Sequence, residues 1–258
     1  MTFPGLPAQA SAHAPEIDFV LGLEHWGMLG LFVFFFAYFV YVLFRFRRSA
    51  NPSASYTGMT SRWSMGVVAA IAVSEVALLV AFELPAWNDR INNLPSPEEA
   101  TVVRVVTEQF AWNVHYPGPD RMFGRTDVNM IAADNPLGLD RSDPAAKDDI
   151  TAINQLTVPV NRPVLIHLTS KDVIHSFTLY EMRVKQDAIP GTDSPVWFIP
   201  TVTTTEMRQK LGKPDFDYEI ACSQLCGLGH YRMRGFLNVV SDEEYRSYLA
   251  QEAQSLRR

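Results

Sequence analysis

Cysteine is scarce in this sequence. Among 258 residues only Cys222 and Cys226 occur, so a disulfide framework, which needs several pairs, is excluded as the source of stability. No Cys-x-x-Cys-His segment occurs either, which excludes a covalently attached c-type haem. The two cysteines form one small-loop disulfide, remain as two free thiols, or act as a pair of metal ligands.

Basic residues are also few. The formal net charge is −6, and residues 86–258 contain 18 Lys and Arg against 23 Asp and Glu. Nucleic-acid binding needs clusters of Lys and Arg that neutralise phosphates, so a nucleic acid is excluded as the partner. An acidic domain favours a basic protein partner, which electrostatic steering attracts.

Charge is absent from one long stretch and nearly absent from a second. Trp26 to Phe44 contains no charged residue, and Trp63 to Leu84 contains only Glu75 and Glu83. Each is long enough to cross a hydrocarbon core of about 30 Å as a helix. Glu75 lies mid-span, where a carboxyl group faces protein or water rather than lipid. The chain therefore divides into an N-terminal extracytoplasmic segment (1–25), a transmembrane helical hairpin (26–85) and an outer domain (86–258).

The segment between the two apolar stretches lacks acidic residues and is flanked by arginines, namely Arg45, Arg47, Arg48 and Arg62. The positive-inside rule places this loop in the cytoplasm. Both termini and residues 86–258 are then expected on the outer, periplasmic side of the plasma (inner) membrane. A signal peptide carries its basic residues before the apolar run, whereas here they follow it.

The outer domain has the pattern of a β-sandwich or barrel of antiparallel strands. Short β-rich runs, some with alternating apolar residues, recur between turn signals: Thr101–Val106, Phe110–Tyr116, Val164–Thr169, Phe216–Ala221 and Gly235–Val240. Residues 117–149 and 187–214 are rich in turn formers and are predicted to be long loops. The capping box from Ser241 to Glu244 predicts a short C-terminal helix.

The segment Cys222-Ser-Gln-Leu-Cys226-Gly-Leu-Gly-His230-Tyr-Arg-Met233 gathers two thiols, an imidazole and a thioether. Such soft donors select copper, zinc or an iron–sulfur cluster. A zinc site would need further thiols or imidazoles and does not use Met, while a blue-copper site takes a single Cys. Two copper ions that share both thiolates would use every donor. A disulfide would leave His230 and Met233 without a role.

The binuclear interpretation requires a second histidine. His175 is the natural candidate because it follows a predicted strand. His167 alternates with the apolar face of its strand and is interpreted as a solvated or satisfied side chain. His115 is interpreted as structural, and His13 and His25 precede the first span.

Three segments are the most specific: Asp172–Phe177, Lys185–Gly191 and Cys222–Met233. With them the sequence resembles cytochrome c oxidase subunit II over both apolar stretches and nearly all of the outer domain. The resemblance implies an N-terminal two-helix transmembrane hairpin plus an all-β cupredoxin-like Greek-key sandwich that holds a dicopper centre, CuA. It implies that the chain accepts electrons from cytochrome c or a similar carrier. The electrons pass to haem in subunit I, which reduces oxygen, and subunit III is a further partner.

The same resemblance implies the copper ligands, which are His175, Cys222, the backbone carbonyl of Gln224, Cys226, His230 and Met233. Relatives usually have Glu at the position of Gln224, where the carboxylate also binds magnesium at the boundary with subunit I. A magnesium ion at that interface would therefore lack this carboxylate here. Many relatives have Trp at the position that Phe110 occupies here, and in them this position is where electrons from the carrier enter the subunit. Phe110 and Trp112 are the candidates for electron uptake, although Trp112 is also expected to pack in the core.

Two further departures concern accessory features. Residues 60–70 contain no Glu, whereas many relatives have one near the start of the second helix for proton uptake. The stretches 117–149 and 191–215 are longer than is common in the family. Two alternative functions are a scaffold that has lost its metal, as in related quinol oxidases, and a copper-delivery or copper-storage protein. The intact ligand set argues against the first, and the Lys185–Gly191 match argues against the second.

Overall fold

The computed structural model describes residues 4–53, 56 and 61–255. The chain forms two compact units. One is built around Glu16–Asp89, and the other combines Pro7–Pro15 with the chain from Arg90 onward. Each unit is described separately below.

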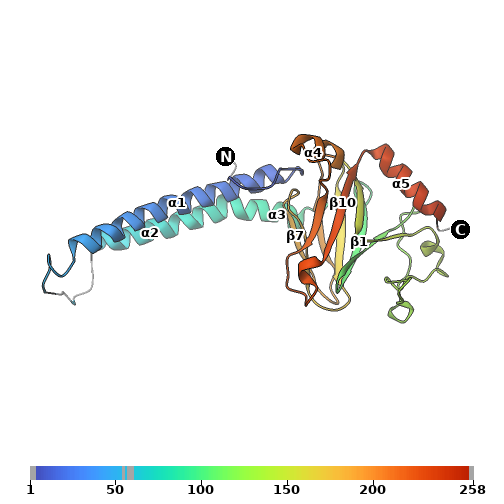
Figure 1. Ribbon diagram of the computed structural model, residues 1–258, viewed down its shortest axis with the longest axis horizontal. Helices are drawn as coiled ribbons and strands as arrows, with labels where there is room; N and C mark the ends of the chain where they lie inside the picture. The colour runs from blue at the N-terminus through green and yellow to red at the C-terminus, as the bar shows by residue number, and fades with distance from the viewer. Residues whose placement is uncertain (1–3, 54–55, 57–60, 256–258) are drawn as a thin grey trace. The chain divides into compact units, whose positions relative to one another are not determined.

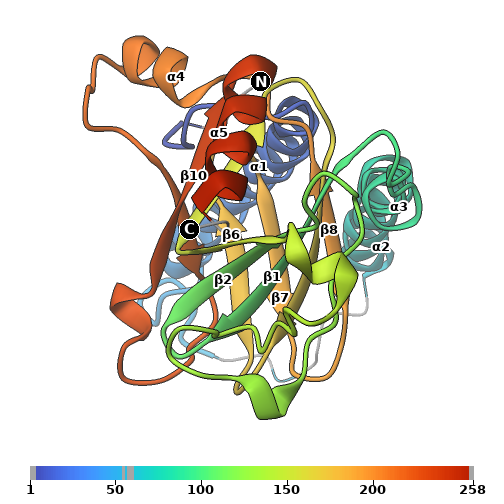
Figure 2. The same ribbon diagram turned by 90° about the vertical axis from the view of Figure 1, so that its right-hand side faces the viewer.

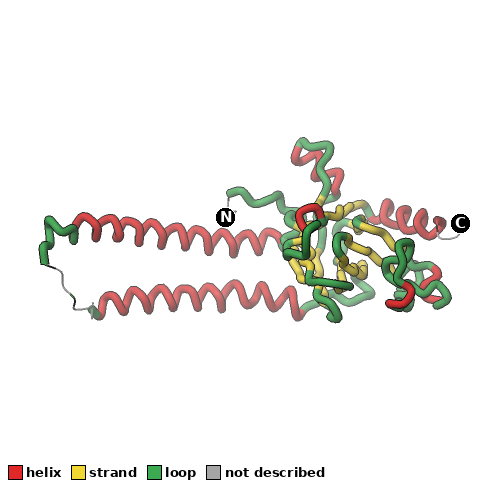
Figure 3. The backbone as a smooth tube through the Cα atoms, turned by 60° about the horizontal axis from the view of Figure 1, so that its bottom comes forward, coloured by secondary structure: helices red, strands yellow, loops and turns green. Residues whose placement is uncertain are grey.

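The first unit consists of two long helical stretches that run antiparallel to each other (Figures 1 and 3). The first stretch is α1 (Ala14–Arg45). The second comprises α2 (Arg62–Leu78), a π-helical turn, η1 (Leu79–Glu83), and α3 (Leu84–Asn92). Each stretch is long and apolar enough to span a membrane, and an 18-residue window within it has a mean hydropathy of 2.3. Both predicted apolar stretches lie inside these helices.

The second unit is a sandwich of two five-stranded sheets, whose layers face each other in Figure 2. One sheet has the order β3-β2-β1-β5-β8, with β1 (Thr101–Glu108), β2 (Ala111–Tyr116), β3 (Ile150–Ile153), β5 (Val164–Ser170) and β8 (Ser194–Phe198). The other has the order β4-β10-β9-β6-β7, with β4 (Gln155–Pro159), β6 (His175–Leu179), β7 (Val184–Ala188), β9 (Tyr218–Cys222) and β10 (Arg234–Val240). The chain crosses between the sheets after β3, β4, β5, β7 and β8.

The core lies between the two sheets. In β1, Val103 and Val105 are buried while Arg104 between them is exposed, as the two-residue period of a strand requires. Trp112 of β2 is fully buried, and its ring meets that of Phe177 in β6 edge-on, with 5.6 Å between centroids. The predicted fold class, a two-helix hairpin followed by a β-sandwich, is confirmed.

Two strand pairs differ from the predicted antiparallel arrangement. β1 pairs with β5, and β10 with β4, in parallel. Alternation of apolar residues shows which face of a strand is buried, but it does not reveal the direction of its neighbour. The expectation that all strands are antiparallel was therefore wrong for these pairs.

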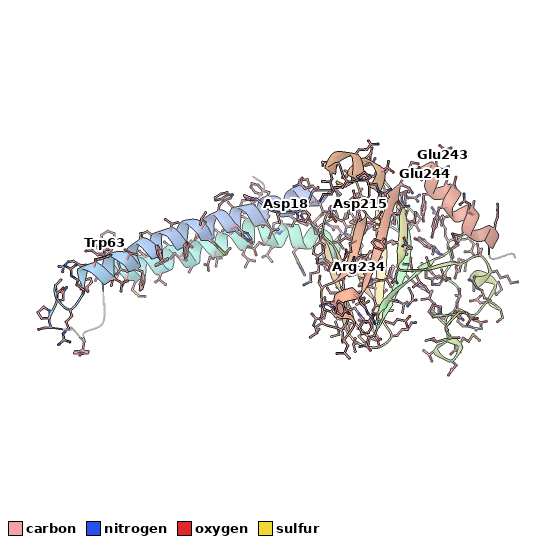
Figure 4. The ribbon with its side chains drawn as sticks, in the orientation of Figure 1. Asp18, Trp63, Asp215, Arg234, Glu243 and Glu244 are labelled. Carbon is pink, nitrogen blue, oxygen red and sulfur yellow. The ribbon has the colours of Figure 1, made fainter. Side chains whose placement is uncertain are left out.

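The predicted loop at 187–214 contains β8 and a short helix, α4 (Thr204–Leu211). That helix begins with a reciprocal capping box between Thr203 and Glu206, a signal that the sequence carried. The predicted C-terminal helix is confirmed as α5 (Asp242–Ser255), where Ser241 and Glu244 form the expected box. Figure 4 labels Glu244 in its first turn.

Residues 117–149 form the predicted long loop, and its helical elements are two 3-10 turns, η2 (Val128–Met130) and η3 (Pro144–Lys147). His115 anchors it to β2, because its Nε2 lies 2.6 Å from the buried carboxylate of Asp149, which also accepts the Gly124 N–H. The structural interpretation of His115 is confirmed. His167 is likewise satisfied, with Nδ1 2.7 Å from Asp193.

Residues 7–15, which end with the first two residues of α1, group with the β-sandwich rather than with the rest of the helices. The Ala10 N–H donates to the carbonyl of Glu181, and the Ala10 carbonyl accepts from Thr201. The Ser11 hydroxyl donates to the carbonyl of Met182 at 2.7 Å. Ala10 is fully buried, so this segment closes one side of the domain.

Candidate metal centre

The first part of the centre is created by the pairing of two strands. β6 lies antiparallel to β9, with Phe177 opposite Cys222. His175 at the start of β6 and Cys222 at the end of β9 therefore lie at the same end of this strand pair. Beyond the ladder, the Ser223 N–H donates to the carbonyl of Ser176 at 3.0 Å. His175 Nδ1 lies 3.9 Å from Cys222 Sγ.

The second part is the loop from β9 to β10, where the 3-10 turn η4 (His230–Arg232) leads into β10; Figure 4 labels Arg234 on that strand. Cys226 Sγ lies 3.8 Å from Cys222 Sγ and 3.6 Å from His230 Nδ1. Met233 Sδ is 3.7 Å from Cys226 Sγ, and the carbonyl oxygen of Gln224 is 3.2 Å from Cys222 Sγ. The structure thus brings all six predicted ligands together.

The spacing of the donors indicates which kind of site they can form. The two sulfurs are farther apart than the about 2.05 Å of a disulfide, but closer than about 4.6 Å, twice a typical metal–sulfur distance. Both can therefore contact the same ion. His175 contacts one thiol and His230 the other, and each thiol has its own weak donor. This doubled set fits two copper ions, whereas a single-copper or zinc site would use only part of it.

The two thiols differ in acidity before any metal binds. Burial alone would raise the pKa of Cys222, but hydrogen bonds with His175 and with the backbone of Ser176 and Gln224 outweigh it and lower the pKa to about 6. Burial raises the pKa of Cys226 to about 11, and the adjacent Cys222 adds to this effect. In the metal-free site Cys222 therefore loses its proton more readily than Cys226.

Asp172 is a functional candidate that the sequence reasoning missed as an individual residue. Its carboxylate lies 3.0 Å from His175 Nε2 and also accepts the Val173 N–H. Burial would raise the pKa of Asp172, and these bonds hold it below its ordinary value. A carboxylate on one imidazole nitrogen fixes the tautomer and directs the other nitrogen toward the metal. The Asp-x-x-His spacing was the available signal.

The two aromatic candidates for electron uptake occupy different environments. Phe110 precedes β2, is half-buried, and packs against the metal loop so closely that a Cβ on Gly229 would lie 2.4 Å from its ring. Trp112 is fully buried beneath the centre, with its ring 6.4 Å from that of His175. Phe110 therefore lies at the surface beside the ligands, and Trp112 supports them from the core.

Two membrane-length helices and a β-sandwich with soft donors at one edge define a membrane-anchored protein with an external cupredoxin-like domain. The family described as "Cytochrome C oxidase subunit II, periplasmic domain" matches residues 101–240. The chain belongs to the cytochrome c oxidase subunit II family, and the resemblance inferred from its motifs is confirmed.

Two named relatives agree with this assignment, and one solved structure is also similar. The chain is 30% identical over 239 residues to the alternative cytochrome c oxidase subunit 2 of Bradyrhizobium diazoefficiens. The aligned region covers 92% of this chain and 80% of that protein. It is 26% identical over 264 residues to cytochrome c oxidase subunit 2 of Cereibacter sphaeroides, covering 96% and 79% respectively. The crystal structure of the periplasmic domain of subunit II from Bradyrhizobium japonicum is 26% identical, with a TM-score of 0.43, covering 63% of this chain and 99% of that one.

The contact between Asp172 and His175 generates a first prediction. Asp172→Ala should weaken copper binding about 10- to 100-fold, because His175 loses the acceptor that fixes its orientation. Competition with a chelator of known affinity measures the change. Asp193→Ala, which breaks the similar pair with His167 on a different strand, is the matched control and should bind copper normally. Equal affinities for the two variants would contradict the role of Asp172.

The unequal thiols generate a second prediction, for pH. Copper must displace the protons that remain on the ligands, so affinity should fall as pH is lowered. The fall should steepen below about pH 6, where Cys222 becomes protonated in addition to Cys226. Chelator competition between pH 5 and pH 8 tests this, and an affinity independent of pH over that range would be inconsistent with it.

Proposed function

We propose that this chain is the electron-accepting subunit of a haem–copper oxidase and that it carries a binuclear CuA centre. The observation that carries the proposal is the doubled donor set, in which each thiol contacts its own imidazole within 4 Å and the two sulfurs lie 3.8 Å apart. The ligands are the six residues named above. Relatives are subunits of cytochrome c and haem–copper oxidases, so membership of an oxidase complex follows from the family.

Bound copper supplies the one-electron chemistry. The chain's contribution is to hold the donors still. His175 and Cys222 are fixed by the β6–β9 ladder, and Met233 directly precedes β10. His175, Cys226 and Met233 are buried, which limits water at the site. Ligands that do not move when an electron arrives keep the transfer fast.

The surface beside the centre supports contact with other proteins. Leu225, Leu228 and Tyr231 on the metal loop are 79%, 97% and 81% exposed. Large apolar residues gathered at one exposed place mark an interaction site. We assign this surface to the electron-transfer partners, which are a soluble carrier such as cytochrome c and subunit I, whose haem receives the electrons. The acidic outer domain would steer a basic carrier toward it.

The orientation in the membrane follows from charge. The arginines that flank the loop between the helices support a cytoplasmic position for that loop, which would put both termini and the β-sandwich on the periplasmic side of the inner membrane. Electrons then arrive from outside the membrane. Oxygen reduction belongs to subunit I, and subunit III completes the proposed assembly.

A magnesium ion at the boundary with subunit I would find only a poor ligand in this chain. The Gln224 side chain is exposed and offers a neutral amide oxygen, whereas magnesium prefers carboxylates. Any divalent ion there would depend on ligands from subunit I.

Metal stoichiometry and spectrum test the proposed centre. The full chain, purified in detergent and loaded with copper, should bind two ions and show one unpaired electron shared equally between them by electron paramagnetic resonance. Cys222→Ser and Cys226→Ser should each abolish the shared signal, because each sulfur would contact both ions. A single ion with an ordinary four-line spectrum would refute the binuclear centre, and weak, readily exchanged copper would favour a storage or delivery protein.

Electron uptake at Phe110 is tested in the assembled oxidase. Phe110→Ala should slow electron transfer from the carrier while copper content and the optical spectrum stay normal, because the ring lies at the surface beside the metal loop. Tyr180→Ala, which removes an exposed aromatic ring just beyond the opposite end of β6, is the control. Unchanged turnover at limiting carrier would refute the role, and loss of copper would identify Phe110 as a support of the loop instead.

A further inference from the structure

The turn between β1 and β2 touches both loops that carry the candidate copper ligands. β1 and β2 pair up to Glu108 and Ala111, so only Gln109 and Phe110 form the turn. One neighbouring loop contains Asp172 and leads into His175 at the start of β6, and the other carries Cys226 and His230. These loops are far apart in the sequence, and the turn lies against both.

Gln109 makes a hydrogen bond to each loop. Its backbone N–H donates to the carboxylate of Asp172 at 2.7 Å, and that carboxylate also holds His175. Its side-chain amide, through Nε2, donates to the backbone carbonyl of Cys226 at 2.6 Å. A single residue thus links the loop of the first imidazole to the loop of the second thiol.

The fit around the Gln109 side chain is close. Gly227 has a φ of +130°, and a Cβ there would lie 2.6 Å from Gln109 Nε2. A side chain at this position would require the Gln109 amide to shift, and glycine adopts the positive φ readily. The chain therefore combines a glycine in the metal loop with a long amide side chain in the turn.

The turn itself is braced from both sides. Glu108 forms an ion pair with Lys171 at 2.7 Å and accepts a hydrogen bond from Asn113 at 2.9 Å. Lys171 directly precedes Asp172, so the brace and the link act on the same loop. These contacts of Glu108 fix the backbone of the turn, and they thereby fix the position from which the Gln109 side chain donates to the Cys226 carbonyl.

We infer that Gln109 is a positioning residue for the metal centre, an inference that rests on the proposed copper-binding function. Its side-chain amide fixes the backbone at Cys226 and thereby the direction of that thiolate relative to His175. Gln109 is not one of the six candidate ligands. Without it, the metal loop keeps its strand attachments at Cys222 and Arg234 and its packing against Phe110, but the Cys226 carbonyl loses its hydrogen bond to the β1–β2 turn.

The test compares Gln109→Met with the wild type, using the copper-loaded full chain in detergent. Met keeps the length of the side chain and removes the donor. The variant should retain two copper ions but show altered copper hyperfine splitting and a shifted reduction potential. Copper loss to a chelator should be about tenfold faster, as expected when a residue supporting a ligand is changed. Gln155→Met, an exposed glutamine at the start of β4, is the matched control and should behave as wild type.

The outcomes separate this inference from the proposed function. A wild-type chain that lacks the two-copper signal refutes the function itself. A Gln109→Met chain with unchanged splitting, potential and chelator rate overturns the positioning role. Where Gln109→Met does not fold, Gln109→Asn replaces it, because its shorter amide cannot reach the Cys226 carbonyl; the same changes are expected. Failure of both variants to fold, with Gln155→Met intact, overturns the inference in favour of a purely structural role.

Discussion

The pairing of β6 with β9 is the constraint on which the candidate centre depends. Phe177 lies opposite Cys222, and this register places His175 beside the first thiol. A slip of one residue would turn every side chain of one strand to the other face and separate the imidazole from the sulfur. The register is held by the core, where Phe177 is fully buried against Trp112. Packing between the sheets therefore determines the geometry of the metal ligands at their edge.

The sequence predicted those parts of the structure that are encoded locally. The ligands from Cys222 to Met233 lie within one loop, so their spacing alone indicated a soft-metal site, and long apolar runs indicated the spans. The parallel pairing of β1 with β5 was not predictable from alternation, which defines a buried face but not a neighbour. The contacts of Asp172 and Gln109 depend on bringing the β1–β2 turn against two distant loops, and no local pattern encodes that approach.

Contacts made by the backbone or by buried pairs of polar side chains were equally hidden. Residues 7–15 join the sandwich mainly through main-chain hydrogen bonds, which leave no signature in residue type. The excursion 117–149 was predicted as a loop from its composition, but its attachment depends on the pair between His115 and Asp149. His115 was correctly interpreted as structural, yet its partner lies 34 residues away and became evident only in the fold.

The position of the centre reconciles two opposing needs of an electron-transfer protein. A buried site protects soft ligands from water and fixes them, whereas exchange of electrons with a separate carrier requires a short path to the surface. In this chain one side of the ligand cluster is formed by buried His175 and Met233 above Trp112, and the other side by a loop whose Leu228 is almost fully exposed. Phe110, half-buried against Gly229, lies at the boundary between them. A loop at the edge of a rigid sandwich meets both needs, because the sheets fix the ligands at its ends while its middle remains at the surface.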